Sequence, residues 1–211
     1  SQVYQPQPND PGIVLIYDGI IEHGGNGAIT MTADLIPWPQ VKNFWAGLVY
    51  AENSLFLNNR RSVAFMKQEN KHFSGFFNCD FINEDGSTNF GITNWGTLSL
   101  EVDNCRFLDI ENSGLYAIDG GFKVTNSEFR NIYHAIELLS TAPLFSKSII
   151  GEPFNGNLFK DNYVAVYGSN INELYVADNV FDTELREGMV DHAVVIEGFS
   201  KYAIEYNSFI G

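Results

Sequence analysis

The tetrapeptide Asn78-Cys79-Asp80-Phe81 returns along this chain in a form that decides its fold. It consists of Asn, a small Ser or Cys, any residue, and Phe. The pattern also stands at Asn53-Ser54-Leu55-Phe56, Asn104-Cys105-Arg106-Phe107 and Asn126-Ser127-Glu128-Phe129, and three later copies move Asn one position on, at Asn157, Asn179 and Asn207 before Phe159, Phe181 and Phe209. The seven Phe residues follow one another at intervals of 22 to 30 residues. Repeats of this length with variable loops are typical of solenoids.

Each Phe lies between two segments with the alternating pattern of a strand that buries one face. Upstream stand segments such as Leu100-Glu101-Val102-Asp103, and downstream a small residue precedes a branched one, as in Gly114-Leu115 and Ala135-Ile136. A small residue there predicts a corner where successive coils approach closely. The predicted fold is all-β, a right-handed parallel β-helix (solenoid) of about seven to eight coils.

Stacking of like residues is the main consequence of this fold. Parallel strands about 4.8 Å apart would place each Phe over the next in one aromatic column inside the solenoid. They would also align Asn157, Asn179 and Asn207 in a ladder of amide hydrogen bonds. A β-sandwich would not predict the repeated motif, and a leucine-rich repeat would need regularly spaced Leu residues that are absent.

The ends of the chain fit the repeat less well. Residues 1–11 are polar, carry three Pro, and are predicted to form an extended N-terminal segment without the pattern of a signal peptide. Residues 12–211 form the predicted solenoid, which we expect to be part of a longer chain. A segment near residues 34–46, rich in Trp and Pro, reads as a loop inserted between coils that covers the open core or binds a ligand.

The acidic composition limits the partners. The chain holds 26 acidic and 12 basic residues, a formal net charge of −14. Such a surface repels phosphate backbones, so nucleic acid is not a predicted partner. No run of about 18 apolar residues occurs, so no membrane insertion is predicted.

Several of these stretches together resemble a known group of proteins. The stretches are residues 58–63, 78–81, 114–122 and 126–129. They are similar to right-handed β-helix segments of large secreted surface proteins of Bacteroidota, which are exported by the type IX pathway. More distantly the chain resembles the pectate-lyase-like superfamily of polysaccharide-degrading enzymes. None of that superfamily's catalytic motifs can be placed on this sequence, so the catalytic residues stay unknown.

This resemblance implies an extracellular or cell-surface location. It favours a non-catalytic role as a rigid scaffold, adhesin or glycan-binding segment, with a glycan or neighbouring coils and domains of the parent protein as partners. The alternative is a polysaccharide lyase or glycoside hydrolase of the pectate-lyase-like type. A shared fold does not establish a shared function. The surface residues therefore have to distinguish the non-catalytic role from the enzymatic one.

The second strand of each coil offers the candidate ligand site. If Leu115 and Ile136 point inward, the residue after each points outward. The outward set, with one acidic residue further along its strand, is Thr93, Tyr116, Glu137, Tyr167 and Asp119. Tyrosines beside a carboxylate can stack on sugar faces and bond hydroxyl groups. We predict a glycan site here; the alternative is a solvated strand face with ordinary cross-strand packing.

The first strand of each coil offers a second outward column. It holds Glu101, Lys123 and Tyr175, with Asp103 on the same face as Glu101. Two carboxylates on one face fit glycosidic acid–base catalysis if their separation is suitable. Lys123 is the one visible candidate for the base of a lyase.

Metal and thiol chemistry receive less support. Cys79 and Cys105 occupy the same place in adjacent coils, where two buried thiols or a disulfide both fit. His134 and His192 are separated by one coil, about 10 Å, too far to share a metal. No metal site or cofactor is predicted; the oxygen-rich loops 83–89 and 182–188 leave calcium possible, although neither matches a known calcium motif.

Overall fold

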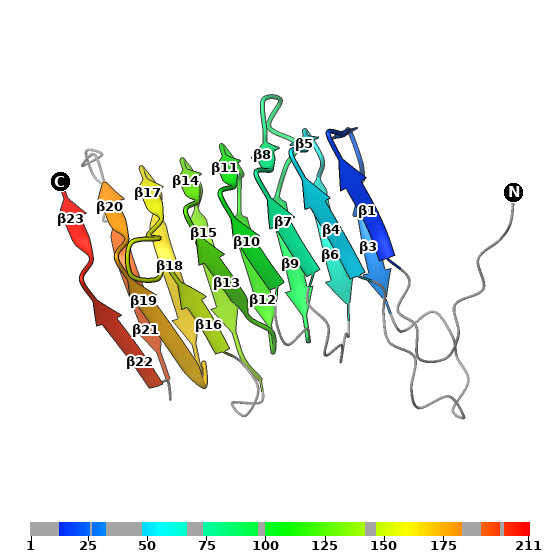
Figure 1. Cartoon of the computed structure of the whole chain (residues 1–211). Helices are drawn as coiled ribbons and strands as arrows, with labels where there is room; N and C mark the ends of the chain where they lie inside the picture. The colour runs from blue at the N-terminus through cyan, green and yellow to red at the C-terminus, as the bar shows by residue number, and fades with distance from the viewer. Residues whose placement is uncertain are drawn as a thin grey trace, which may run out of the picture.

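The computed structural model describes residues 13–25, 27–32, 48–66, 74–96, 100–141, 147–182, 191–198 and 201–211. The predicted N-terminal segment 1–11 and the predicted loop near 34–46 lie outside these residues. Within the described ranges the chain consists of short strands joined by turns (Figure 1). None of the described residues belongs to a helix that could span a bilayer.

Every strand belongs to one of three parallel sheets. The first sheet contains, in spatial order, β1 (Ile13–Tyr17), β4 (Leu48–Glu52), β7 (Ser74–Phe77), β10 (Leu100–Asp103), β13 (Phe122–Thr125), β16 (Lys147–Ile150), β19 (Glu173–Ala177) and β22 (Lys201–Glu205). The second contains β2 (Ile20–Glu22), β5 (Leu55–Leu57), β8 (Asp80–Ile82), β11 (Arg106–Leu108), β14 (Glu128–Arg130), β17 (Leu158–Lys160), β20 (Val180–Asp182) and β23 (Ser208–Ile210). The third contains β3 (Ile29–Thr32), β6 (Arg61–Met66), β9 (Phe90–Trp95), β12 (Ser113–Ile118), β15 (His134–Leu139), β18 (Val164–Ser169) and β21 (His192–Glu197).

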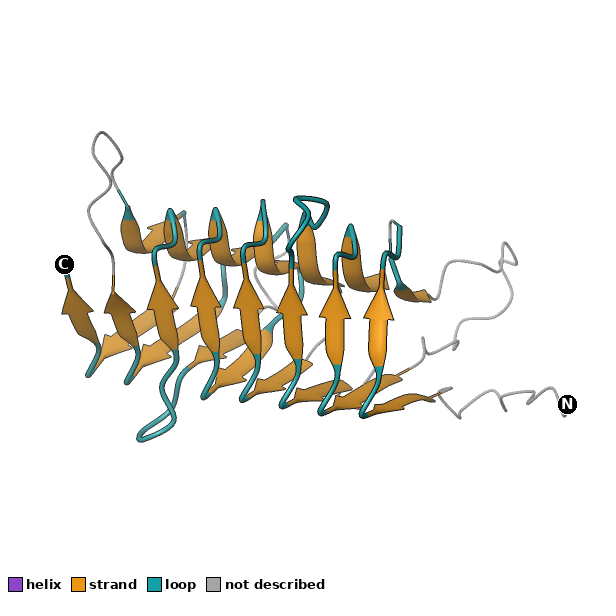
Figure 2. Cartoon of the chain, turned by 90° about the horizontal axis from the view of Figure 1, so that it is seen from above, coloured by secondary structure: helices purple, strands orange, loops and turns teal. Residues whose placement is uncertain are grey.

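Consecutive strands enter different sheets, and each strand pairs in parallel with the strand one coil away. Figure 2 shows the three sheets running side by side along the molecule, joined at corners by short turns. The fold is therefore a parallel β-solenoid with three parallel sheets, as the sequence predicts. Two strands per coil flank the Phe motif, and the strand that carries the Phe forms the narrow second sheet.

The predicted Phe column is confirmed. Rings of the seven motif Phe residues stack with centroids 4.5 to 5.2 Å apart and interplanar angles of 0° to 11°. Six of them are buried, whereas Phe209 at the end of the column is 62% exposed. The column is the centre of a single apolar core that runs the length of the described coils.

The corner after the first sheet uses Asn in two different ways. The four motif residues Asn53, Asn78, Asn104 and Asn126 adopt φ of 51° to 52°, the left-handed conformation that Asn tolerates. The predicted ladder of Asn157, Asn179 and Asn207 is confirmed one position further on. The Asn179 amide donates to the Ile150 carbonyl (2.8 Å) and its side-chain oxygen accepts from the Asn157 backbone (2.9 Å).

The small residue near the start of each third-sheet strand marks a close approach of coils, as predicted. A Cβ atom added to Gly91 would lie 2.4 Å from the Gly114 carbonyl oxygen. The same atom on Gly114 would lie 2.8 Å from the Ala135 carbonyl oxygen. Substitution by a larger residue would therefore push successive coils apart.

Candidate functional site

The third sheet carries the site that the sequence predicts, and its register is as expected. Thr93, Tyr116, Glu137 and Tyr167 are paired in this order along β9, β12, β15 and β18. The preceding residues, such as Leu115, point into the core and are fully buried.

Two members of this predicted site serve the fold. Thr93 is only 2% exposed. Its hydroxyl donates a hydrogen bond to the Val63 carbonyl oxygen at 3.4 Å. Asp119 lies in the turn after β12 with φ of 55°. Its carboxylate accepts hydrogen bonds from the Thr141 backbone (2.6 Å) and the Ser140 hydroxyl (3.1 Å). Both side chains thus stabilise the joints between coils.

Glu137 is also engaged within the protein. Its carboxylate accepts a hydrogen bond from the Ser113 hydroxyl (2.7 Å) and lies 3.2 Å from His134 Nδ1. Burial raises the pKa of Glu137, but the bonds from His134 and Ser113 outweigh this and leave the pKa below its ordinary value. Burial, followed by the charge of Glu137, raises the pKa of Tyr116. The carboxylate is therefore held ionised by its neighbours.

The aromatic rings of this face pack on one another. The His134 and Tyr167 rings stack at 5.5 Å, and Tyr133 stacks on Tyr163 at 4.7 Å. The Tyr167 hydroxyl donates to Glu197 at 2.7 Å. Ring faces and polar groups that a sugar would use are thus already occupied in large part.

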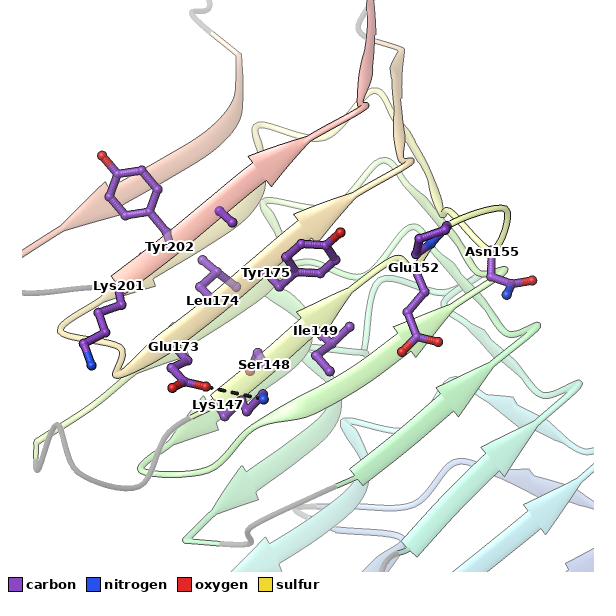
Figure 3. Close-up of a pocket in the computed structure, with 12 residues that line it drawn as sticks. Lys147, Ser148, Ile149, Glu152, Asn155, Glu173, Leu174, Tyr175, Lys201 and Tyr202 are labelled. Carbon is purple, nitrogen blue, oxygen red and sulfur yellow. Dashed lines mark ion pairs between the residues drawn. The ribbon is translucent and has the colours of Figure 1, made fainter.

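The first sheet carries a groove of about 610 Å³ over β16, β19 and β22. Figure 3 shows Tyr175 in its middle, Tyr202 on the β22 side, and Glu152 and Asn155 on the opposite side. Ile149 and Tyr175 are neighbours in the outward column that also holds Glu101 and Lys123. The sequence thus singled out Tyr175 as outward, although not as part of its predicted ligand site.

Charged residues line the end of the groove where the strands begin. Lys147, Glu173 and Lys201 are neighbours in register, so positive and negative charges alternate across the coils. Lys147 Nζ lies 3.4 Å from Glu173 Oε2. Lys201 is exposed and forms no ion pair with a residue that the structure describes. Among the described residues, the groove therefore offers the ammonium group of Lys201 outside any ion pair.

The predicted enzymatic residues of this face are tied into pairs. Lys123 Nζ lies 3.2 Å from Glu152 and 3.7 Å from Glu101. The bond with Glu152, followed by the charge of Glu101, holds the pKa of Lys123 above its ordinary value, so this amine stays protonated and is a poor base. Asp103 accepts hydrogen bonds from Thr125 (2.7 Å) and Asn126 (2.8 Å).

A turn between β16 and β17 forms the wall of the groove. It runs from Gly151 to Asn157, and Glu152 and Asn155 close it with two backbone hydrogen bonds of 3.4 and 2.8 Å. Figure 2 shows this turn standing out from the corner between the first and second sheets. The long interval of 30 residues between Phe129 and Phe159 is the sequence signal that could have revealed it.

Thiols and oxygen-rich loops add no further site. Cys79 and Cys105 are free, buried thiols in this structure, and burial raises the pKa of the Cys105 thiol. Within loop 83–89 the Asn83 and Asp85 side chains accept backbone hydrogen bonds from the same loop. Residues 183–188 of the second predicted loop are outside the described part. No cluster of three or more His, Cys, Asp or Glu able to hold a metal occurs among the described residues.

Comparisons with protein-family models, with curated proteins and with solved structures find no match to this chain. The candidate site is therefore argued from its geometry alone.

Proposed function

We propose that this chain is a non-catalytic β-solenoid that binds a glycan in the groove of the first sheet. The observation that carries the proposal is the groove itself, which sets the half-buried, outward ring of Tyr175 between charged and amide groups at both ends. Its volume falls in the range of small-molecule sites, about 300–1,000 Å³. Aromatic rings with nearby hydrogen-bonding groups suit the apolar faces and hydroxyl groups of sugars.

The state of the charged side chains favours binding over turnover. A lyase needs a base that can be deprotonated, and Lys123 is paired with two carboxylates. A hydrolase needs two carboxyl groups free to act on one bond, and Glu101 and Asp103 both have partners. The polysaccharide-degrading alternative would therefore have to use other residues.

The proposal also covers the number of coils, the handedness of the solenoid and its location. Two sheets of eight strands and one of seven support a solenoid of about seven to eight coils. The general preference for right-handed crossovers between parallel strands supports a right-handed coil. Placement on a cell surface, as an adhesin or scaffold of Bacteroidota type, rests on the motif resemblance. Proposed partners are a glycan and neighbouring domains.

A glycan-array screen tests the proposal, combined with assays for reducing sugars and unsaturated products on the same polysaccharides. We expect binding without turnover, weakened about tenfold or more in Tyr175→Ala because the ring at the centre of the groove is lost. Tyr167→Ala, on the third sheet, is the matched control and should bind normally. Turnover of any polymer, or loss of binding only in Tyr167→Ala, would contradict the proposal.

A further inference from the structure

The corner between the first and second sheets contains one departure from its usual form. Between β4 and β5, β7 and β8, or β10 and β11, two residues make the bend. Between β16 and β17 seven residues, Gly151–Asn157, make the same connection. Loops added to a regular scaffold are frequent sites of recognition.

The added residues form a fixed turn. Its two backbone hydrogen bonds join Glu152 to Asn155, and the Glu152 carboxylate lies 3.2 Å from Lys123. The Phe154 backbone N–H donates to Asp178 at 2.7 Å. A Cβ atom on Gly156 would lie 1.7 Å from the Asp178 carbonyl oxygen, so the base of the turn packs directly on the next coil. The turn is therefore preorganised.

This rigid turn displays a phenylalanine to solvent. The Phe154 side chain is 99% exposed and its backbone has φ of 68°. Twelve of the fifteen non-glycine residues with positive φ are Asn or Asp, for which this conformation is tolerated. For a large aromatic residue it is strained. Nothing inside the described chain compensates this strain by contact with the ring, which points to a contact outside the chain.

The surface beside Phe154 has the complementary shape. The groove of the first sheet lies next to the turn, which contributes Glu152, Pro153 and Asn155 to its lining. Ile149 and Tyr175, neighbours in the outward column, line it further. The sheet thus presents an apolar knob and an apolar groove side by side, the arrangement that a self-complementary two-fold interface needs.

Charges on this face are also self-complementary. The strand starts carry Lys147 and Lys201, the latter without an ion pair to any residue that the structure describes, whereas Asp178 lies beside the knob at the strand ends. For the two first sheets to face each other, the two-fold axis must lie parallel to them, and an axis perpendicular to the strands reverses the strand direction in the second copy. It would therefore bring the lysines of one copy over the Asp178 of the other.

We propose that, without glycan, two copies of this chain associate through their first sheets, with Phe154 of each copy inserted into the groove of the other, so that the dimer and a glycan compete for the groove. A bilayer is a poorer fit, because Glu152 and Asp178 flank the ring and anionic headgroups would repel them. The net charge of −14 opposes association at low salt, so screening should strengthen the dimer.

Sedimentation velocity of the full chain without any glycan tests this proposal, so its result is independent of glycan binding. We expect a dimer at about 100 µM in physiological salt, where the Debye length is about 8 Å, and a smaller dimer fraction when salt is lowered about tenfold. Phe154→Gly should shift the equilibrium at least tenfold toward monomer. It removes the ring and also relieves the backbone strain, so folding should be retained.

Two further variants complete the test. Tyr133→Ser removes an exposed aromatic ring from a different part of the surface and should leave the dimer unchanged. Lys201→Glu should weaken association several-fold by placing like charges opposite each other. A wild-type chain that stays monomeric at this concentration and salt would overturn the proposal. A dimer that persists unchanged in Phe154→Gly would overturn it as well.

Discussion

The outer faces of the first and third sheets contain similar residues and differ in what those residues contact. On the third sheet the Glu137 carboxylate is bonded by Ser113 and His134, and Tyr167 donates to Glu197. On the first sheet Ile149 and Tyr175 line an open groove, and Lys201 has no ion-pair partner among the described residues. On the third face these side chains are engaged with one another, whereas the first face carries the groove that we propose as the ligand site.

Outward orientation of a side chain is therefore a weak indicator of function in a solenoid. Each outward residue has neighbours one coil above and below, so polar side chains readily satisfy one another along the stack. At the proposed site the turn Gly151–Asn157 interrupts the regular stacking.

The largest expected effect is on the core beneath both faces. Phe107→Ala removes a fully buried ring that stacks between Phe81 and Phe129. The free energy of unfolding should fall by roughly 3–5 kcal/mol, because the coils close the cavity only partly. Urea denaturation measures this loss. A loss below about 1 kcal/mol would mean that the ring is not stacked in the core.

A smaller loss of stability should distinguish the buried Asn ladder from the exposed one. Asn179→Ala removes the amide that bonds Ile150, Asn157 and Asn207 inside the corner, and should cost about 1–3 kcal/mol per buried group left without a partner. Asn104→Ala removes a solvent-exposed amide bonded to Asn78 and should cost less, about 1 kcal/mol. Equal losses in denaturant titrations of the two variants would contradict this ordering.

The smallest effect concerns the structural role of the third face. The folded-state pKa of Glu137 is lowered, so its stabilising contribution is present above the ordinary glutamate pKa of about 4.3 and is lost as pH falls through the folded-state pKa. Glu137→Gln should destabilise by about 1 kcal/mol at pH 7. That difference from wild type should shrink as the pH falls below about 4.3.

Glu173→Gln on the first face is the control for this experiment. Its exposed ion pair with Lys147 should contribute little, within about 0–1 kcal/mol. A difference between Glu137→Gln and wild type that stays constant from neutral to acidic pH would show that ionised Glu137 does not stabilise the fold.

Sequence patterns predicted the features that repeat from coil to coil. The Phe column, the ladder of Asn157, Asn179 and Asn207, and the pairing of Tyr116 with Glu137 all follow from the rule that like residues stack. Which outer face carries the proposed ligand site could not be predicted in this way. It depends on contacts between residues about one coil apart, such as the bond from Ser113 to Glu137, and on the non-repeating turn that walls the groove.

The assignment of the ligand site to the first sheet is tested most directly by NMR. Backbone amide chemical shifts of the isotope-labelled chain would be recorded while an oligosaccharide selected on the array is added. The proposed function predicts that the largest shifts fall on Ile149, Tyr175 and Tyr202. Shifts concentrated on Tyr116, Glu137 and Tyr167 would place the site on the third sheet and contradict the assignment.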